Sequence, residues 1–512
     1  MEYPSTKVDK LSSRGKRRRK ILCCDGRAAD DDARRQEADL PSHDIADLSA
    51  TDLVRLYRRR ELSPVEVVDD VLARIDRFDP VVNAFVLVDR EGARKAARES
   101  EARWMKGAPL GLVDGLGATV KDNVWAKGWP ARKGSLTTDA APMPEDAPAV
   151  ARLREQGAVI LGKTTLPEYG WIGACHSPLT GITRNPWRLD RTPGGSSGGA
   201  AAAALLNLGS LHIGTDGAGS IRIPAAFTGV FGIKAHFGRV PAWPASPFSV
   251  LAHVGPLTRT VADAALMLNV IAEPDARDMA AFNTRPPDYR VGLNDGVRGL
   301  RIAWSPRLGY VGKVDPEVEA AAAAAAQGFA ELGAIVEEAD PGFAEPIDLI
   351  TTLWGAVSAT IVDSVPETER SRMDPGFRRL AEQGRRVTLA RYLAAYQARA
   401  DLADAMNRFH ARYDLLLTPQ MAVPAIEAGR VTPADGSYGE DWINWSPYTY
   451  PFNLTQQPAA SVPCGFTRAG LPIGLQIVGP ARCDHLVLRA ARAFEHLRPF
   501  VMLSSPRADR AG

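Results

Sequence analysis

Residues 194–199 read Gly-Gly-Ser-Ser-Gly-Gly, and residues 214–222 read Gly-Thr-Asp-Gly-Ala-Gly-Ser-Ile-Arg. Glycine adopts backbone conformations that other residues avoid, so both stretches predict tight turns that carry a serine, Ser196 in the first and Ser220 in the second. Upstream, an apolar run ends at Lys121, which predicts a buried lysine. A buried, neutral lysine can take the proton of a serine, so the three residues predict a serine nucleophile that needs no histidine.

The size and charge of the chain set wide bounds. Its 512 residues hold 45% hydrophobic residues, enough for the core of one large α/β domain or of two domains. The net charge is +2, from 62 basic and 60 acidic residues. Such a balance gives no electrostatic reason to expect nucleic acid or an anionic membrane as partner, and it leaves a homodimer open.

The cysteines and the apolar runs indicate a cytoplasmic protein. The five cysteines are scattered, which predicts a reducing compartment and no disulfide framework. No CxxC pair and no HExxH motif occurs, so we expect neither a metal nor a cofactor. The longest apolar runs fall short of the roughly 18 residues that span a bilayer.

Residues 1–43 have the composition of a disordered tail. They are charged and poor in aromatic residues, and they include the basic cluster of residues 16–20. The apolar stretch after that cluster is too short for a signal peptide. We therefore expect the folded domain to span residues 44–505.

Local patterns in that domain alternate between helix and strand. Ser49 and Ser63 each precede a helical apolar pattern, and Ser63-Pro64-Val65-Glu66 is a capping box. Residues 300–304 and 334–336 are short apolar runs on either side of an alanine-rich helix for which Asp315 is the expected N-cap. The predicted fold is α/β, one large domain with a mixed, twisted sheet covered by helices on both sides. We expect the more helical region 275–445 to select the substrate.

Two motif matches carry less weight than their spelling suggests. Gly157-Ala-Val-Ile-Leu-Gly162-Lys163-Thr164 fits the phosphate-loop pattern, but its four central residues predict a straight buried strand. Residues 194–198 fit the nucleophile elbow of an α/β-hydrolase. The elbow follows a strand, whereas the polar, proline-bearing segment 188–193 predicts a loop.

A larger set of motifs, in a fixed order, accounts for most of the chain. Lys121 is followed by the two glycine-rich turns, and then come segments near the C-terminus: Asn453-Leu-Thr455, Pro458-Ala459, Ser461-Val-Pro463-Cys-Gly465-Phe466 and Gly470-Leu-Pro472-Ile-Gly474-Leu-Gln476. Over residues 45–500 the chain resembles the amidase signature family, whose members hydrolyse carbon–nitrogen bonds with a Lys–Ser–Ser triad.

The resemblance implies a role for each residue of the triad. Ser220 is the nucleophile that forms an acyl-enzyme, Ser196 is the bridging serine, and Lys121 is the base. The bond Gly195–Ser196 is cis in the family, so Gly195 and Ser197 are expected to support Ser196. From the residues alone, a simple ion pair between Lys121 and Asp122 is the alternative.

The second turn is expected to bind the oxyanion. By the resemblance, its backbone N–H groups converge on one point; they belong to Gly217, Ala218, Gly219 and Ser220. Ala218 stands where the family has glycine, which would strain the turn if that position required a positive φ. Asp216 and Arg222 are expected to brace the turn as an ion pair.

The substrate is less well defined than the reaction. A small or aryl amide is the favoured substrate, with carbamates and esters as alternatives for the same triad. A glutaminase subunit of a tRNA-dependent amidotransferase and a catalytically silent binding scaffold also remain open. The aromatic residues that could line an apolar pocket are Trp171, Trp354, Trp442 and Trp445.

Overall fold

Two capped helices open the part of the chain that the computed structural model describes, residues 45–507. Ser49 caps α2 (Ala50–Arg59) and Ser63 caps α3 (Pro64–Val82), and a capping box is present at both starts. Each box satisfies backbone N–H groups that a helix start otherwise leaves without a partner. Both helix starts are confirmed. The disordered tail predicted for residues 1–43 lies outside the described residues.

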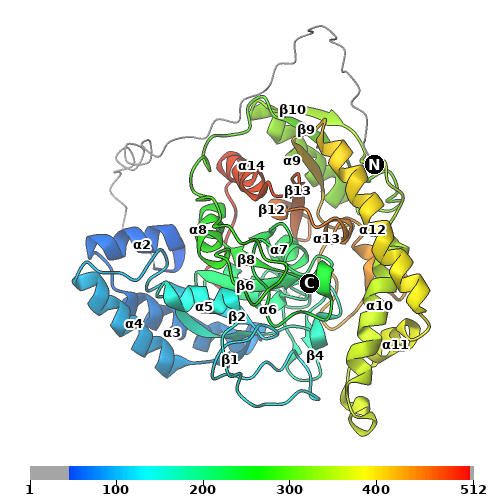
Figure 1. Cartoon of the computed structure of the whole chain (residues 1–512). Helices are drawn as coiled ribbons and strands as arrows, with labels where there is room; N and C mark the ends of the chain where they lie inside the picture. Colours follow the sequence, from blue (N-terminus) through cyan, green and yellow to red (C-terminus); the bar gives the residue numbers. More distant parts are fainter. Residues whose placement is uncertain (1–44, 508–512) are drawn as a thin grey trace, which may run out of the picture. The chain divides into compact units, whose positions relative to one another are not determined.

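Among residues 45–507, eleven strands form one mixed sheet in the order β1-β3-β2-β6-β8-β7-β12-β13-β11-β9-β10 (Figure 1). β2 pairs in parallel with β3 and β6, and β9 pairs in parallel with β10 and β11, while the other neighbours are antiparallel. The strands are β1 (Phe85–Val88), β2 (Gly117–Lys121), β3 (Val159–Thr164), β6 (Leu211–Asp216), β7 (Phe231–Lys234), β8 (His253–Thr258), β9 (Arg301–Trp304), β10 (Ile335–Glu338), β11 (Leu415–Pro419), β12 (Ala459–Phe466) and β13 (Pro472–Val478). β4 (His176–Ser177) and β5 (Gly181–Ile182) form a separate pair.

Helices flank this sheet, as the α/β prediction requires (Figure 1). The remaining α-helices are α4 (Arg90–Met105), α5 (Pro148–Glu155), α6 (Gly198–Leu205), α7 (Arg222–Thr228), α8 (Val261–Ile271), α9 (Pro316–Glu331), α10 (Ile347–Asp363), α11 (Pro375–Gly384), α12 (Leu389–His410), α13 (Pro451–Leu454) and α14 (Asp484–Leu497). Short 3₁₀ helices are η1 (Ile45–Asp47), η2 (Glu168–Gly170), η3 (Ser249–Leu251), η4 (Glu367–Arg372) and η5 (Trp442–Trp445).

The predicted strand–helix–strand unit is present as β9, α9 and β10. Asp315 caps α9, where its side chain accepts hydrogen bonds from the N–H groups of Glu317 and Val318. The segment that fits the phosphate-loop pattern is β3, a fully buried strand between β1 and β2. Its Gly-Lys-Thr residues therefore lie in a straight strand and form no loop, as predicted.

The last hairpin of the sheet joins its two halves. β12 pairs with β7, which ends the first half, and β13 pairs with β11, which begins the second. β7 and β11 are not neighbours, so the two halves are connected within the sheet only by β12 and β13 in the described chain.

A second apolar cluster lies away from the main core. It includes Ile350 and Trp354 of α10, Phe377 of α11, and Trp442 and Trp445 of η5. The helices α10, α11 and α12 pack on one another and lie beside the sheet (Figure 1). They fall within residues 275–445, whose role in substrate selection stays a prediction.

No helix in residues 45–507 is both long enough and apolar enough to cross a membrane. The domain bounds 44–505 stay a prediction, and so does a homodimer.

Candidate active site

The sheet brings the predicted site residues together at one edge. Lys121 is the last residue of β2 and Asp216 is the last residue of β6, and these strands are parallel neighbours. Ser220 lies on the turn between β6 and α7, and Ser196 lies just before α6. The carboxyl ends of parallel strands meet at one edge of a sheet, so turns that are distant in sequence converge there.

Lys121 is fully buried among hydroxyl groups. Its Nζ lies 2.6 Å from Ser196 Oγ, and it lies 2.9 Å from both Ser197 Oγ and Thr215 Oγ1. Burial lowers the pKa of Lys121 to about 7, because water that would stabilise the charged amine is excluded. A substantial share of this lysine is therefore neutral near pH 7.

The ion pair between Lys121 and Asp122, the alternative left open by the sequence, is absent. Asp122 Oδ1 lies 3.1 Å from Lys163 Nζ, and both side chains are buried. Lys163 also donates to the carbonyl oxygens of Val124 and Pro130, each at 3.0 Å. The carboxylate next to Lys121 in sequence is thus taken by another cation.

Both serines line one cavity of about 330 Å³. Ser196 is 3% exposed and Ser220 is 5% exposed. Between the described residues, no hydrogen bond joins the two hydroxyls. The Gly195–Ser196 bond is cis, as the resemblance implies. A Cβ on Gly195 would lie 2.1 Å from the carbonyl oxygen of Ala174, so no side chain fits at that position.

The turn after β6 differs from the prediction at Gly219. Its N–H donates to Asp216 Oδ1 at 2.7 Å, so it is not free to bind an oxyanion and the prediction for Gly219 is corrected. Within residues 45–507, the N–H groups of Gly217, Ala218 and Ser220 have no acceptor. Gly219 has φ 121°, whereas Ala218 has no positive φ, so alanine at 218 introduces no backbone strain.

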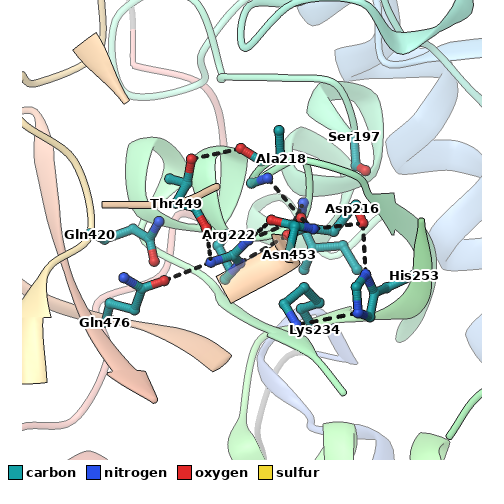
Figure 2. Close-up of polar contacts among 12 residues, drawn as sticks. Ser197, Asp216, Ala218, Arg222, Lys234, His253, Gln420, Thr449, Asn453 and Gln476 are labelled. Atoms are coloured by element: carbon teal, nitrogen blue, oxygen red, sulfur yellow. Dashed lines mark hydrogen bonds and ion pairs between the residues drawn. The ribbon is translucent and has the colours of Figure 1, made fainter. Parts of the chain in front are cut away.

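Asp216 holds this turn from behind (Figure 2). Its carboxylate accepts hydrogen bonds from Arg222 Nε at 3.0 Å and from Asn453 Nδ2 at 2.9 Å, so the expected Asp216–Arg222 ion pair is present. Burial favours the neutral acid, but the charge of Arg222 outweighs it and holds the pKa of Asp216 below its usual range. Arg222 also donates to Gln476 Oε1 at 2.7 Å.

Sequence reasoning assigned no role to several residues of this network. Thr449 Oγ1 donates to the carbonyl oxygen of Ala218 at 2.6 Å and so fixes the middle of the turn (Figure 2). His253 Nδ1 lies 3.2 Å from the carbonyl oxygen of Asp216, and Lys234 Nζ lies 3.4 Å from His253 Nε2. Burial lowers the pKa of both Lys234 and His253, which favours their neutral forms. Within the network, charge is then concentrated in the Asp216–Arg222 pair.

Aromatic side chains form much of the cavity wall. The ring of Phe248 stacks on Trp354 with centroids 4.0 Å apart. Of the four tryptophans that were expected to line an apolar pocket, Trp354 alone lines this cavity among the described residues. Trp445 packs against Phe227 instead. The other aromatic residues of the lining are Trp125, Tyr169 and Trp243.

Groups that hold metals are not gathered in this part of the chain. Residues 45–507 contain no cluster of three or more His, Cys, Asp or Glu side chains with metal-binding geometry. The chemistry argued from this site therefore uses side chains and backbone groups.

Comparison with known proteins identifies the family. A model of the amidase family matches residues 66–488. The chain belongs to the amidase family. It is 38% identical over 459 residues to an acylamidase of Rhodococcus erythropolis, with 88% of this chain and 96% of the relative covered. It is also 37% identical over 489 residues to one of the subunits of the glutamyl-tRNA(Gln) amidotransferase of Myxococcus xanthus, with 90% and 99% covered.

A solved structure agrees with the amidase assignment. A bacterial aryl acylamidase of the amidase signature family superimposes with a TM-score of 0.83 at 31% identity, with 89% of this chain and 97% of that chain covered. The predicted family and the predicted α/β fold are confirmed. This amidase is accordingly a hydrolase of amide carbon–nitrogen bonds.

Proposed function

We propose that the chain hydrolyses small or aryl amides through Ser220, with Ser196 as proton relay and Lys121 as base. One observation carries the proposal. Lys121 is buried without a carboxylate partner, its pKa is held at about 7, and its Nζ lies 2.6 Å from Ser196 Oγ. A lysine can act as a base only in its neutral form, and this environment favours that form.

The proton moves along the two serines in the proposed reaction. Ser220 Oγ attacks the amide carbonyl carbon and gives its proton to Ser196, which gives its own proton to Lys121. The proton returns through Ser196 to the leaving nitrogen, because an amide nitrogen leaves poorly unless it is protonated. Water then hydrolyses the acyl-enzyme on Ser220 by the same route. The relay requires Ser220 Oγ to turn toward Ser196 when substrate binds.

The negative charge on the carbonyl oxygen needs donors that are fixed before the reaction. We assign this role to the N–H groups of Gly217, Ala218 and Ser220, which have no acceptor among the described residues. The bonds of Asp216 and Thr449 to the turn hold these groups in place, so little reorganisation is needed as charge develops.

The cavity wall supports a flat, apolar substrate. Phe248, Trp354, Trp125 and Trp243 give aromatic surface next to the two serines, and aromatic rings pack well against aryl groups. Carbamates and esters offer the same carbonyl carbon to Ser220, so they remain alternatives that a substrate panel separates.

The similarity to a glutamyl-tRNA(Gln) amidotransferase chain makes a glutaminase the second candidate. Glutamine carries an α-carboxylate and an α-ammonium group, which require partners of opposite charge. Lys133 lines the cavity and can meet the carboxylate, but Asp216, the acidic residue of the lining, is held by Arg222. The described lining thus offers no free acid for the ammonium group, which favours the amide without charged ends.

The deciding experiment is a panel of a short primary amide, an anilide, glutamine, an aryl carbamate and an aryl ester, run with wild type and Ser220→Ala. Cleavage of the anilide or the primary amide, with a loss of at least about 10³-fold in Ser220→Ala, supports the proposal. Cleavage of glutamine alone favours the glutaminase. An inert wild type that a serine-directed reagent does not label favours a silent scaffold.

For location we propose the cytoplasm. Cys175, Cys464 and Cys483 carry free thiols in the described chain, and free thiols are typical of reducing compartments.

A further inference from the structure

A second cavity, of about 290 Å³, lies among α10, α11, the start of α12 and η5. Its inner residues are apolar: Trp171, Ile350, Trp354 and Trp442 are each 5% exposed or less. Trp354 lines this cavity and also the cavity that holds Ser196 and Ser220, so one indole separates the two. The second cavity plays no part in the proposed hydrolysis.

One polar group inside this wall has no partner. The indole Nε1 of Trp171 is buried and makes no hydrogen bond within residues 45–507. Nε1 of Trp354 differs, since it donates to the carbonyl oxygen of Trp171 at 3.3 Å. A buried donor without an acceptor is unfavourable, and a ligand atom that accepts a hydrogen bond would satisfy it.

The rim carries three arginines that nothing in the described chain neutralises. Arg379, Arg386 and Arg391 line the cavity, and their side chains make no ion pair and no hydrogen bond among residues 45–507. Their neighbour Arg385 is different, because its Nη2 lies 2.7 Å from Asp363 Oδ1. The free guanidinium groups are thus confined to the side that faces the cavity.

The rim also carries two acidic residues, Glu440 and Asp441, just before η5. Neither forms an ion pair with an arginine in the described structure. With three guanidinium groups and two carboxylates, the lining keeps a net charge of +1. The excess positive charge and the buried indole donor both favour a ligand that presents an acceptor with negative charge.

We propose that this second cavity binds a small apolar carboxylate, with its aromatic or branched body among the tryptophans and its carboxylate on the arginine rim. A guanidinium group presents paired N–H donors that match the two oxygens of a carboxylate. The tryptophan faces supply the apolar surface that such a molecule buries. The inference does not rest on the proposed hydrolysis, since the ligand is bound and not converted.

Calorimetric titration of the full chain with 3-phenylpropanoate tests the site. The probes 3-phenylpropanol and 3-phenylpropylamine share its body but carry no charge and a positive charge. We expect the acid to bind at least about tenfold more tightly than either, because only the acid pairs with the arginines. Binding of the alcohol or the amine as tight as that of the acid overturns the proposal, and so does undetectable binding of the acid at about 10 mM.

Two variants locate the bound acid. Arg379→Gln/Arg386→Gln removes two rim cations, and we expect it to weaken the acid by at least about tenfold. Arg385→Gln removes one charge from the same helix end but outside the cavity, so it should change the affinity less than about twofold. An unchanged affinity in the double variant, as expected if the acid occupies the catalytic cavity instead, overturns the proposal. An equal loss in Arg385→Gln does the same.

Discussion

The carboxylate of Asp122 lies 3.1 Å from the ammonium group of Lys163, and both side chains are buried. This pair decides the state of the neighbouring Lys121. An adjacent carboxylate would stabilise a charged lysine and raise its pKa. Because Lys163 takes that carboxylate, Lys121 is left among hydroxyl groups and burial dominates its pKa.

Removing Lys163 should destabilise the fold strongly. Lys163→Met leaves the carboxylate of Asp122 buried without a partner, which costs about 3–5 kcal/mol. We expect a marked fall in the thermal midpoint, and Lys163→Met/Asp122→Asn should recover part of it. Lys127→Met, at an exposed lysine, is the control and should leave the midpoint nearly unchanged. A midpoint in Lys163→Met equal to that of wild type would contradict a structural role for the pair.

Activity should rise with pH through neutrality. Lys121 accepts a proton only when neutral, and burial lowers its pKa to about 7. Below that pH the amine is protonated, so log kcat/KM should fall with a slope of about one per pH unit, and above it the profile should level off. Lys121→Arg keeps a permanent charge and should be inactive across the range. Full activity below pH 5 speaks against a lysine base.

Thr449 should act on the rate more than on binding. Thr449→Val removes the hydrogen bond to the carbonyl oxygen of Ala218, which loosens the N–H groups proposed to bind the oxyanion. We expect kcat to fall by about tenfold with little change in KM, since that charge develops only in the transition state. Thr449→Ser keeps the hydroxyl and should retain most of the rate. A rise in KM at constant kcat would assign Thr449 to ground-state binding instead.

Neighbouring positions in the oxyanion turn should respond in opposite ways. At Gly219, φ is 121° and a Cβ would lie 2.7 Å from Thr449 Cβ, so Gly219→Ala should lower kcat/KM by about 100-fold or more, or prevent folding. Ala218 has no positive φ, and Ala218→Gly should change kcat/KM less than about threefold. Kinetics and circular dichroism of both variants give the comparison. Equal effects at the two positions would show that backbone strain is not the cause.

Phe248 should determine how well aryl substrates compete with small ones. Its ring lines the catalytic cavity and stacks on Trp354 with centroids 4.0 Å apart. Phe248→Ala removes aromatic surface, so kcat/KM for an anilide should fall about tenfold more than kcat/KM for a short primary amide. If both substrates lose activity equally, Phe248 serves the fold and not selectivity.

Features that depend on nearby residues could be predicted from the sequence. The caps at Ser49, Ser63 and Asp315 follow from local hydrogen bonding, and the structure has all three. The turns that carry Ser196 and Ser220 were visible because glycine patterns mark them. The ion pair between Asp216 and Arg222 also lies within one short segment.

Features that join distant segments could not be predicted in this way. Thr449 contacts Ala218 across 231 residues, and no pattern around Thr449 indicates that contact. The occupied N–H of Gly219 depends on the direction of the Asp216 carboxylate, which composition does not reveal. The placing of Trp354 between two cavities depends on how α10 packs, so its apolar character alone could not distinguish wall from core.

The hairpin of β12 and β13 has a consequence for the order of assembly during synthesis. Lys121, Ser196 and Ser220 leave the ribosome early, together with the strands of the first half of the sheet. Those strands gain their link to the second half only when residues 459–478 emerge, and Gln476, which anchors Arg222, arrives with them. The nascent chain therefore carries its reactive groups long before the frame that aligns them, and catalysis begins only once the hairpin closes the sheet.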